Sequence, residues 1–194
     1  RQIEEDGFNI DEKIDNLLSS DSKSSIVKST GLATMLLADS FEKLNPDVVL
    51  LLGDRFETHA AATTALLINI PIAHIHGGEI TEGAVDEQIR HSITKMSYLH
   101  FCSTEVYRQR IIQMGEDSFR VFNTGAPGID NIVNFELLSK SALEKQLDWK
   151  FAQKCALFTY HPVTLANDDL KKDLSIIFDV LVNSEISVLF TYAN

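Results

Sequence analysis

The chain has 194 residues, of which 44% are hydrophobic and 23% are charged. This length and composition are typical of a globular protein with one large or two small cores, and they exclude a disordered or collagen-like chain. No apolar run approaches the roughly 18 residues of a membrane span, and the net charge of −11 without a concentrated basic patch argues against nucleic-acid binding.

The two cysteines, Cys102 and Cys155, each lie in an apolar run that is typical of a strand. A disulfide framework is therefore not expected, and a reducing, cytoplasmic location fits best. The sequence begins at Arg1 without a signal-peptide pattern and stops just after an apolar run. We therefore expect a piece of a longer protein.

Short apolar runs alternate with helical patterns along the chain. This alternation is typical of βα units and predicts an α/β fold with a parallel sheet covered on both faces. The expected strands are 48–52, 72–75, 99–103, 120–123, 155–160 and 186–190. The expected helices are 22–44, 55–68, 87–96, 104–114, 129–137, 141–149 and 168–183.

Two segments of the chain allow more specific structural predictions. In the helix expected at 87–96, Ile89, Ile93 and Met96 recur at helical spacing, which predicts one buried stripe with Arg90 away from it. The stretch 125–128 (GAPG) predicts a turn into a helix with proline in its first turn. Because the strand and helix rhythm is interrupted from there to residue 150, we expect a domain boundary in that region.

A first polar cluster directly follows the strand expected at 48–52. Asp54 stands three residues before Glu57, a spacing that a helix capping box would explain without any catalytic role. Arg55 lies at the positive end of the expected helix, where a cation is disfavoured. An anionic ligand nearby would account for it, so Asp54 and Arg55 are candidate site residues.

The second cluster, 74–79 (HIHGGE), closes the next strand. His74 and His76 are two residues apart, so we expect their side chains on the same face of the strand, beside two glycines that permit close backbone approach. With Glu79 or Asp86 they could form a zinc or iron site, although the helical His-Glu-x-x-His spacing is absent. Core or hydrogen-bonding histidines are the alternative.

The third cluster opens the helix expected at 87–96. Asp86 could serve only as the N-cap of this helix. Glu87 and His91 could form an ordinary pair one helical turn apart. This cluster therefore indicates a functional site only in combination with the other clusters.

The fourth candidate is His161, at the carboxyl end of the strand expected at 155–160, where Pro162 prevents the strand from continuing. Open α/β sheets bind ligands at the carboxyl ends of their strands. His59 and His100 lie within a predicted helix and a predicted strand, and we expect structural roles for them.

Four segments together resemble the hydrolysing UDP-N-acetylglucosamine 2-epimerases of bacterial sialic-acid synthesis: 52–57 (LGDRFE), 74–79 (HIHGGE), 86–96 (DEQIRHSITKM) and 160–162 (YHP). Their order and spacing match, and the resemblance runs along the whole chain. It implies two Rossmann-like domains that face each other across a cleft, the glycosyltransferase-B arrangement.

On that likeness, residues 1–148 form most of the N-terminal domain with the interdomain connection, and residues 149–194 begin the C-terminal nucleotide-binding domain. The opening strand and most of the C-terminal domain would be missing from this sequence. The implied partner is a UDP-sugar, with neither nucleic acid nor membrane, and we expect a homo-oligomer, a dimer or a tetramer.

The resemblance also implies a reaction. UDP is eliminated from a 2-acetamido sugar nucleotide, and water then adds to the glycal with inversion at C2, which releases N-acetylmannosamine. Such chemistry needs a base, an acid and stabilisation of developing charge. The implied catalytic carboxylates are Asp54, Glu79 and Asp86, and His161 is implied to contact the substrate or the leaving group.

Arg55, His76, Arg90 and His91 are the implied substrate-binding residues, and neither a metal nor a cofactor is expected. Some family members carry a glutamate where His76 stands, whereas the bacterial sialic-acid branch often has the His-Gly-Gly-Glu sequence found here.

Three alternatives remain open at this point. A close relative in the same family acts on UDP-N,N'-diacetylbacillosamine and feeds the synthesis of legionaminic acid. A metal-dependent hydrolase would use His74, His76 and Glu79. A non-catalytic module would bind a sugar nucleotide without converting it.

Overall fold

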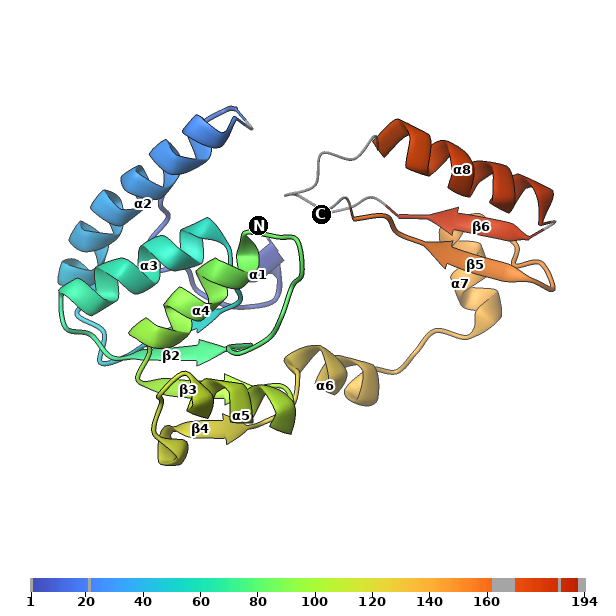
Figure 1. The fold of residues 1–194 in the computed structure, drawn as a ribbon. Coiled ribbons are helices and arrows are strands. Elements are labelled where there is room, and N and C mark those ends of the chain that lie inside the picture. The colour runs from blue at the N-terminus through green and yellow to red at the C-terminus, as the bar shows by residue number, and fades with distance from the viewer. Residues whose placement is uncertain (1, 21, 162–169, 185, 192–194) are drawn as a thin grey trace. The chain divides into compact units, whose positions relative to one another are not determined.

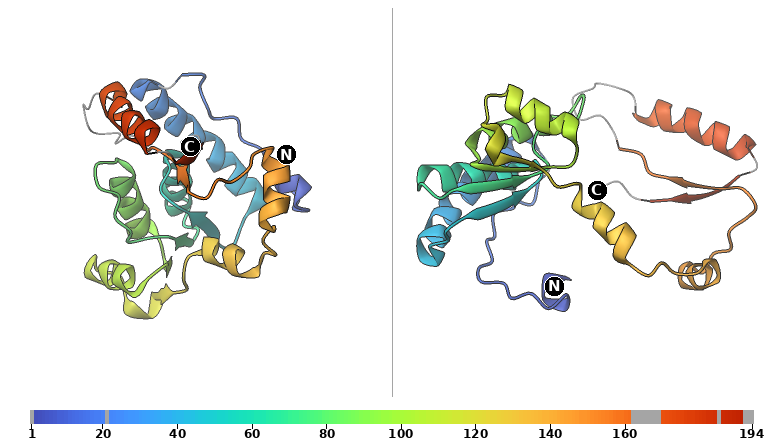
Figure 2. Two further views of the ribbon diagram at one scale, coloured as in Figure 1. Left: turned by 90° about the vertical axis from the view of Figure 1, so that its right-hand side faces the viewer. Right: turned by 90° about the horizontal axis from the view of Figure 1, so that it is seen from below.

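The computed structural model describes residues 2–20, 22–161, 170–184 and 186–191. The chain divides into two compact units, residues 1–130 and 131–194, whose ribbons are drawn in Figures 1 and 2. The domain boundary predicted between residues 148 and 149 lies inside the second unit and stays a prediction. Within the described residues, no helix combines the length and the apolar character needed to cross a membrane.

The first unit is built on a four-stranded parallel sheet (Figure 1). Its strands lie side by side in chain order and are β1 (Val49–Leu52), β2 (Ile72–Ile75), β3 (Leu99–Cys102) and β4 (Val121–Asn123). The connecting helices are α3 (Phe56–Leu67), α4 (Asp86–Met96) and α5 (Glu105–Gln113), and a short 3-10 helix, η1 (Ser118–Arg120), precedes β4. Every strand of this sheet agrees with a predicted apolar run to within one residue at each end, so the α/β class is confirmed.

The connecting helices pack on one face of this sheet. On that face the side chains are buried: Leu51, Ile72, His74, His100, Cys102 and Val121. They form the core with helix residues such as Ala65 of α3, Ile93 of α4 and Ile111 of α5. Successive right-handed crossovers that always step in the same direction along a sheet place their helices on the same face.

The opposite face of the sheet is open. Leu50 and Leu52 of β1 are 63% and 59% exposed, and Phe122 of β4 is 43% exposed. The Phe122 ring stacks on Phe101, with 5.7 Å between the ring centroids. A sheet covered on both faces was predicted, and the described structure of this unit differs because its crossover helices lie on one side.

A long helix, α2 (Lys23–Leu44), packs on α3. The Ser22 side chain caps its start by accepting a hydrogen bond from the Ser25 backbone N–H, and Asn45 ends it in the left-handed conformation. Small side chains such as Ala33 of α2 and Ala60 of α3 are buried, which allows the two helices to approach closely. A four-residue helix, α1 (Gln2–Glu5), lies near the start of the chain.

The second unit contains a small parallel sheet. Its strands β5 (Cys155–Phe158) and β6 (Ser187–Phe190) pair in parallel, and α8 (Leu170–Asn183) lies between them in sequence. The Phe190 ring packs edge-on against Phe158 and Phe178, with centroids 5.3 and 5.5 Å away. The first two residues of the helix predicted at 168–183 lie outside the described residues.

Two short helices precede this sheet, α6 (Pro127–Asn134) and α7 (Lys140–Leu147). Pro127 is the first residue of α6, as the GAPG stretch predicts. Both cysteines are free, Cys102 in the core and Cys155 at the surface, in agreement with the expectation of no disulfide.

Candidate active site

Polar side chains gather at the carboxyl edge of the four-stranded sheet, where open α/β folds bind ligands. Two adjoining hollows there share His76 and Glu79. One continues to Asp54 and Arg90, and the other to Ser103. The structure therefore brings together five of the predicted site residues, namely Asp54, Arg55, His76, Glu79 and Arg90.

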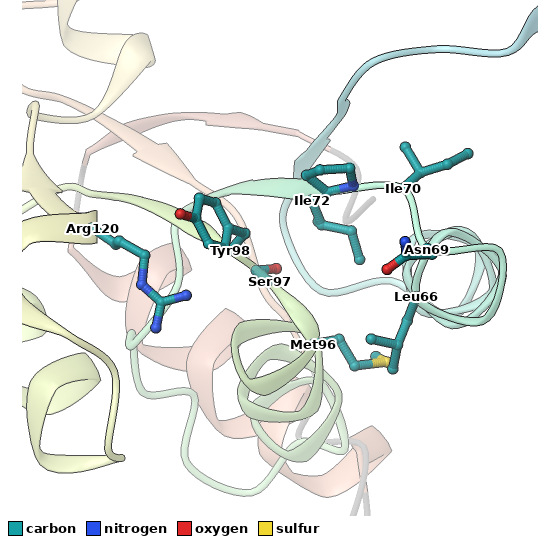
Figure 3. A pocket seen from close by; sticks show the side chains of 9 residues that line it. Leu66, Asn69, Ile70, Ile72, Met96, Ser97, Tyr98 and Arg120 are labelled. Atoms are coloured by element: carbon teal, nitrogen blue, oxygen red, sulfur yellow. The ribbon is translucent and has the colours of Figure 1, made fainter.

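A different hollow, of about 240 Å³, lies at the opposite edge of the sheet (Figure 3). Its lining includes the apolar side chains of Ile72 and Met96. The Arg120 guanidinium lies over the Tyr98 ring, 4.8 Å from the centroid. None of the predicted site residues that the structure describes lines this hollow, so we place the candidate active site at the carboxyl edge.

Asp54 forms a buried ion pair with Arg90 of α4. Arg90 Nη2 donates to Asp54 Oδ2 and to Thr81 Oγ1, the latter at 2.9 Å. The Arg90 side chain is only 8% exposed, and its Nε and Nη1 are buried with no hydrogen-bond partner in the described part of the chain. Because a buried cation needs a counter-charge, Asp54 holds Arg90 in place, and two nitrogens of Arg90 have no partner among the described residues.

This pair corrects two sequence-based expectations. Arg90 was predicted to lie away from the buried stripe of α4, and it is instead buried, because Asp54 at the sheet edge offsets its charge. Asp54 could have been a helix-capping residue. The N-cap of α3 is Arg55, and it makes no side-chain capping bond, while the carboxylate of Asp54 faces Arg90.

A second cluster joins His76, Glu79 and Ser103. Glu79 Oε1 lies 2.6 Å from His76 Nδ1, and it accepts a hydrogen bond from Ser103 Oγ at 2.6 Å. The side chains of His76 and Glu79 are 26% and 25% exposed. The cluster is therefore partly desolvated and still open to a ligand.

Steric packing explains why a glycine is needed at position 78, the second residue after His76. Gly78 has φ +76°, and a Cβ there would lie 2.8 Å from both Ile111 Cγ1 and the Tyr107 carbonyl oxygen of α5. Arg110 Nη1 also donates to the Gly78 carbonyl oxygen at 2.5 Å. The turn that carries Glu79 is thus fixed against α5.

His74 does not share a face with His76. β2 ends at Ile75, and His76 adopts the left-handed conformation with φ +66°, which breaks the alternation of a strand. His74 is fully buried, and its Nε2 donates to the Gly53 carbonyl oxygen at 2.9 Å. Burial lowers the pKa of His74 to about 4, so this ring is neutral and ties β2 to the residue before Asp54.

The metal alternative relied on His74 together with His76 and Glu79. The fully buried His74 ring is bonded to the backbone, whereas His76 and Glu79 line the hollows. Over residues 2–20, 22–161, 170–184 and 186–191, no group of three or more His, Cys, Asp or Glu side chains is arranged to hold a metal ion.

Asp86 is the first residue of α4, and the residue in the N-cap position is Val85, without a side-chain capping bond. Asp86 therefore does not act as the N-cap that one interpretation suggested. Asp86 lies close enough to Arg55 to affect its pKa. The Glu57 carboxylate raises the pKa of the Arg55 guanidinium most, and Asp86 and Asp54 raise it further. Asp54, Asp86 and Arg55 thus belong to one electrostatic neighbourhood.

Glu87 and His91 form the predicted contact one helical turn apart, with 3.9 Å between Oε1 and Nε2. Glu87 Oε2 also accepts a hydrogen bond from the Thr81 backbone N–H at 3.2 Å, which ties the preceding loop to α4. Burial lowers the pKa of His91, and its Nδ1 is buried without a partner among the described residues.

A sequence model of one family, described as UDP-N-acetylglucosamine 2-epimerase, matches residues 1–194. The chain belongs to the UDP-N-acetylglucosamine 2-epimerase family. The GDP/UDP-N,N'-diacetylbacillosamine 2-epimerase (hydrolyzing) of Campylobacter jejuni is 45% identical, across 100% of this chain and 50% of that protein. For the UDP-N,N'-diacetylbacillosamine 2-epimerase (hydrolyzing) of Legionella pneumophila, identity is 37%, across 97% and 50% of the two chains. The polysialic acid biosynthesis protein P7 of Escherichia coli is 40% identical, across 90% and 46%.

Solved epimerases of this family have the same fold. The UDP-GlcNAc 2-epimerase of Neisseria meningitidis bound to UDP-GlcNAc superposes with a TM-score of 0.76 at 27% identity, covering 90% of this chain and 50% of that one. The enzyme of Methanocaldococcus jannaschii in complex with UDP-GlcNAc and UDP gives 0.74 at 20% identity, covering 87% and 48%. The predicted Rossmann-like, glycosyltransferase-B-type class is confirmed, and the chain spans about half the length of the curated relatives it matches.

The remaining predicted site residue, His161, lies in the second unit. It is exposed and follows β5. The residues from 162 to 169 lie outside the described residues. Its contact with a substrate or leaving group therefore stays a prediction.

Sequence reasoning missed two residues of this site, Ser103 and Thr81. Ser103 holds Glu79, and Thr81 accepts a hydrogen bond from Arg90. Ser103 directly follows β3, so the rule that ligands bind at carboxyl ends could have found it. Thr81 lies in a loop without any such signal.

Proposed function

We propose that the protein is a hydrolysing UDP-sugar 2-epimerase, which eliminates UDP from a 2-acetamido sugar nucleotide and hydrates the resulting glycal. Membership of the 2-epimerase family supports this reaction class. The main structural support is that Asp54 and Glu79 line one hollow at the carboxyl edge of the sheet, beside the buried Arg90.

The reaction needs two proton transfers at C2. In the first half, a base removes the C2 proton. The electron pair of the C2–H bond forms the C1=C2 double bond, and the C1–O bond to the diphosphate breaks. In the second half, a proton returns to C2 on the opposite face, and a water oxygen bonds to C1. We assign this acid–base work to the cluster that contains Asp54, Glu79 and Asp86.

Substrate binding is proposed for Arg55, His76, Arg90 and His91, and contact with the substrate or leaving group for His161. The two nitrogens of Arg90 without a partner support its role, because guanidinium groups bind anionic oxygens through charge-assisted hydrogen bonds. The exposed Arg55 at the start of α3 adds a positive charge. The proposal uses no metal ion or cofactor.

We propose UDP-N-acetylglucosamine as the substrate, with N-acetylmannosamine and UDP as products. UDP-N,N'-diacetylbacillosamine is the second candidate. It is favoured by the two relatives at 45% and 37% identity that carry its name, while a relative at 30% identity carries the name UDP-N-acetylglucosamine 2-epimerase.

The test uses the whole protein, meaning residues 1–194 together with any sequence that adjoins them in its gene. Equal concentrations of the two sugar nucleotides are supplied separately, and UDP and the free sugar are quantified. We expect UDP and N-acetylmannosamine from UDP-N-acetylglucosamine at the higher kcat/KM. A higher kcat/KM for UDP-N,N'-diacetylbacillosamine would transfer the assignment to that substrate.

The same assay addresses the other classes of function. A metal-dependent hydrolase would lose activity to a chelator and regain it with metal, and a binding module would bind the nucleotide without releasing UDP. We also propose, from the family resemblance, that the protein is a dimer or tetramer, which analytical ultracentrifugation of the whole protein tests.

A further inference from the structure

The contact between His76 and Glu79 has a defined proton position. A carboxylate oxygen can only accept hydrogen bonds, so the His76 Nδ1 that lies 2.6 Å from Glu79 Oε1 carries a proton. Ser103 Oγ donates to the same oxygen at 2.6 Å. His76 Nε2 has no hydrogen-bond partner in the described part of the chain, and the ring lines both hollows of the carboxyl edge. The imidazole thus has one nitrogen anchored and one nitrogen free.

We propose that His76 is the acid that returns the proton to C2 of the glycal, and that Glu79, anchored by Ser103, is a positioning residue that orients the His76 ring. This inference rests on the proposed epimerase function and divides the work within its acid–base cluster. It moves His76 from substrate binding to proton transfer. Glu79 then acts on the substrate through His76.

The charges of the neighbouring groups favour this division of roles. Asp54 is the counter-ion of the buried Arg90 guanidinium, so a protonated Asp54 would leave that charge uncompensated. Asp54 therefore does not suit the acid that returns the proton to C2, because that group has to be protonated at the start of the step. The Glu79 carboxylate, in contrast, stabilises a His76 ring protonated on both nitrogens, as carboxylates that orient a catalytic histidine do.

The backbone also holds His76 in an unusual position. A non-glycine residue with φ +66° is strained, and such strain persists where the surrounding structure enforces it, often at functional sites. Here the enforcement comes from the following turn, since Gly78 is packed against Ile111 and accepts a hydrogen bond from Arg110. In β2 the alternation of side chains places His74 in the core. Because His76 is in the left-handed conformation, it does not continue this alternation, and its side chain is not buried with His74.

In the proposed step the Nε2–H bond of the His76 imidazolium breaks, and the proton bonds to C2 with the electron pair of the glycal C1=C2 double bond, which leaves C1 electron-deficient. The oxygen of a water molecule bonds to C1 and releases one proton to solvent. Neutral His76 is left with its Nδ1–H on Glu79, and it regains a proton from solvent before the next turnover.

The experiment separates the two halves of the reaction in the whole protein. With UDP-N-acetylglucosamine, the His76→Asn variant is expected to keep UDP release within about tenfold of wild type, to lose about 10² to 10⁴ of the rate of sugar formation, and to accumulate the glycal. Asp54→Asn should instead lose UDP release. The matched control is His59→Gln on α3, which should keep both rates.

Three further variants test the positioning role. Glu79→Gln should also accumulate glycal, Ser103→Ala should do so more weakly, and the double variant of Glu79 and His76 should be no worse than His76→Asn. Added imidazole should restore glycal hydration in His76→Ala, which shows a folded site. If His76 variants lose UDP release together with sugar formation, or keep both, the proposal is overturned.

A readout independent of activity completes the test. In the whole protein labelled with ¹⁵N in its histidine rings, the His76 signals are identified by their loss in His76→Asn. We expect a proton on Nδ1 and a change in the ring signals in Glu79→Gln. An unprotonated Nδ1, or ring signals that ignore Glu79→Gln, would overturn the inference. Absence of UDP release from either sugar nucleotide by the wild type would instead count against the proposed function.

Discussion

A buried guanidinium such as that of Arg90 needs a partner of opposite charge, and Asp54 is that partner. The Asp54→Asn substitution removes the negative charge while keeping the shape of the side chain. We expect it to lower the turnover of the whole protein by about 10² to 10⁴ and its free energy of unfolding by about 1–3 kcal/mol. Steady-state kinetics and urea denaturation of the same preparation measure both quantities.

Glu57→Gln is the matched control for that prediction. Glu57 pairs with Arg55, whose side chain is 72% exposed, and an exposed ion pair contributes about 0–1 kcal/mol. This variant should therefore change neither quantity much. Wild-type turnover in Asp54→Asn would remove Asp54 from the catalytic cluster.

His74 links stability to pH. Its pKa in the folded protein is lowered from 6.5 to about 4 by burial, so the unfolded chain binds a proton at a higher pH than the folded one does. The contribution of the neutral ring is therefore complete above pH 6.5 and is lost as the pH falls from 6.5 to 4. At 1.36 kcal/mol for each pKa unit, the loss amounts to about 3 kcal/mol.

The measurement compares the free energies of unfolding of wild type and His74→Asn at pH 7.5 and at pH 4. We expect the difference between the two proteins to shrink by about 3 kcal/mol at the lower pH. The control is His59→Gln, which should follow the wild type at both pH values. A difference that does not depend on pH would show that the folded protein and the unfolded chain bind the His74 proton with the same pKa.

The sequence predicted part of this site for a clear physical reason. Asp54 and Glu79 lie within four residues of the ends of predicted strands, and the carboxyl ends of parallel strands meet at one edge. The burial of Arg90 was not predictable, because it depends on a partner 36 residues away in sequence. The separation of His74 from His76 depends on a single left-handed residue after β2, which periodicity does not reveal.

At the level of elements, the turn between β2 and α4 is fixed by its packing against α5. In Gly78→Ala the new Cβ would lie 2.8 Å from Ile111 Cγ1 and from a backbone oxygen, at φ +76°. We expect a loss of more than about 1 kcal/mol in the free energy of unfolding and a loss of turnover, since the turn carries Glu79. Thermal unfolding and the UDP-release assay measure the two effects.

Gly31→Ala provides the matched control for this element. Gly31 lies within α2, and a Cβ there meets nothing within 4 Å. Because alanine favours a helix over glycine by about 1 kcal/mol, this variant should be neutral or more stable. Equal stability of the Gly78 and Gly31 variants would contradict the packing described for the turn.

The elements themselves were predictable from local patterns. Apolar runs identified all four strands of the first sheet, and the spacing of Ile89, Ile93 and Met96 identified the packed face of α4. Which faces of the sheet are covered could not be predicted from these patterns. The open face that exposes Leu50 and Leu52 follows from the direction of the crossovers and not from any single strand.

At the scale of the molecule, the chain spans about half the length of the curated relatives it matches. Its net charge of −11 makes a poor environment for a diphosphate unless other segments supply cations and helix N-termini. A protein of residues 1–194 alone should therefore neither turn over UDP-N-acetylglucosamine measurably nor bind UDP more tightly than about 1 mM, or about −4 kcal/mol. Calorimetry with UDP measures this, and micromolar binding would place the nucleotide site within these residues.

The proposed function requires that the whole protein breaks and remakes the C–H bond at C2 of the sugar in UDP-N-acetylglucosamine. Reaction in D₂O, followed by NMR of the released sugar, tests it most directly. We expect stoichiometric UDP and N-acetylmannosamine with one deuterium at C2, and loss of both products in Asp54→Asn. Release of N-acetylglucosamine with its C2 proton retained would show simple hydrolysis, and the protein would then not be a 2-epimerase.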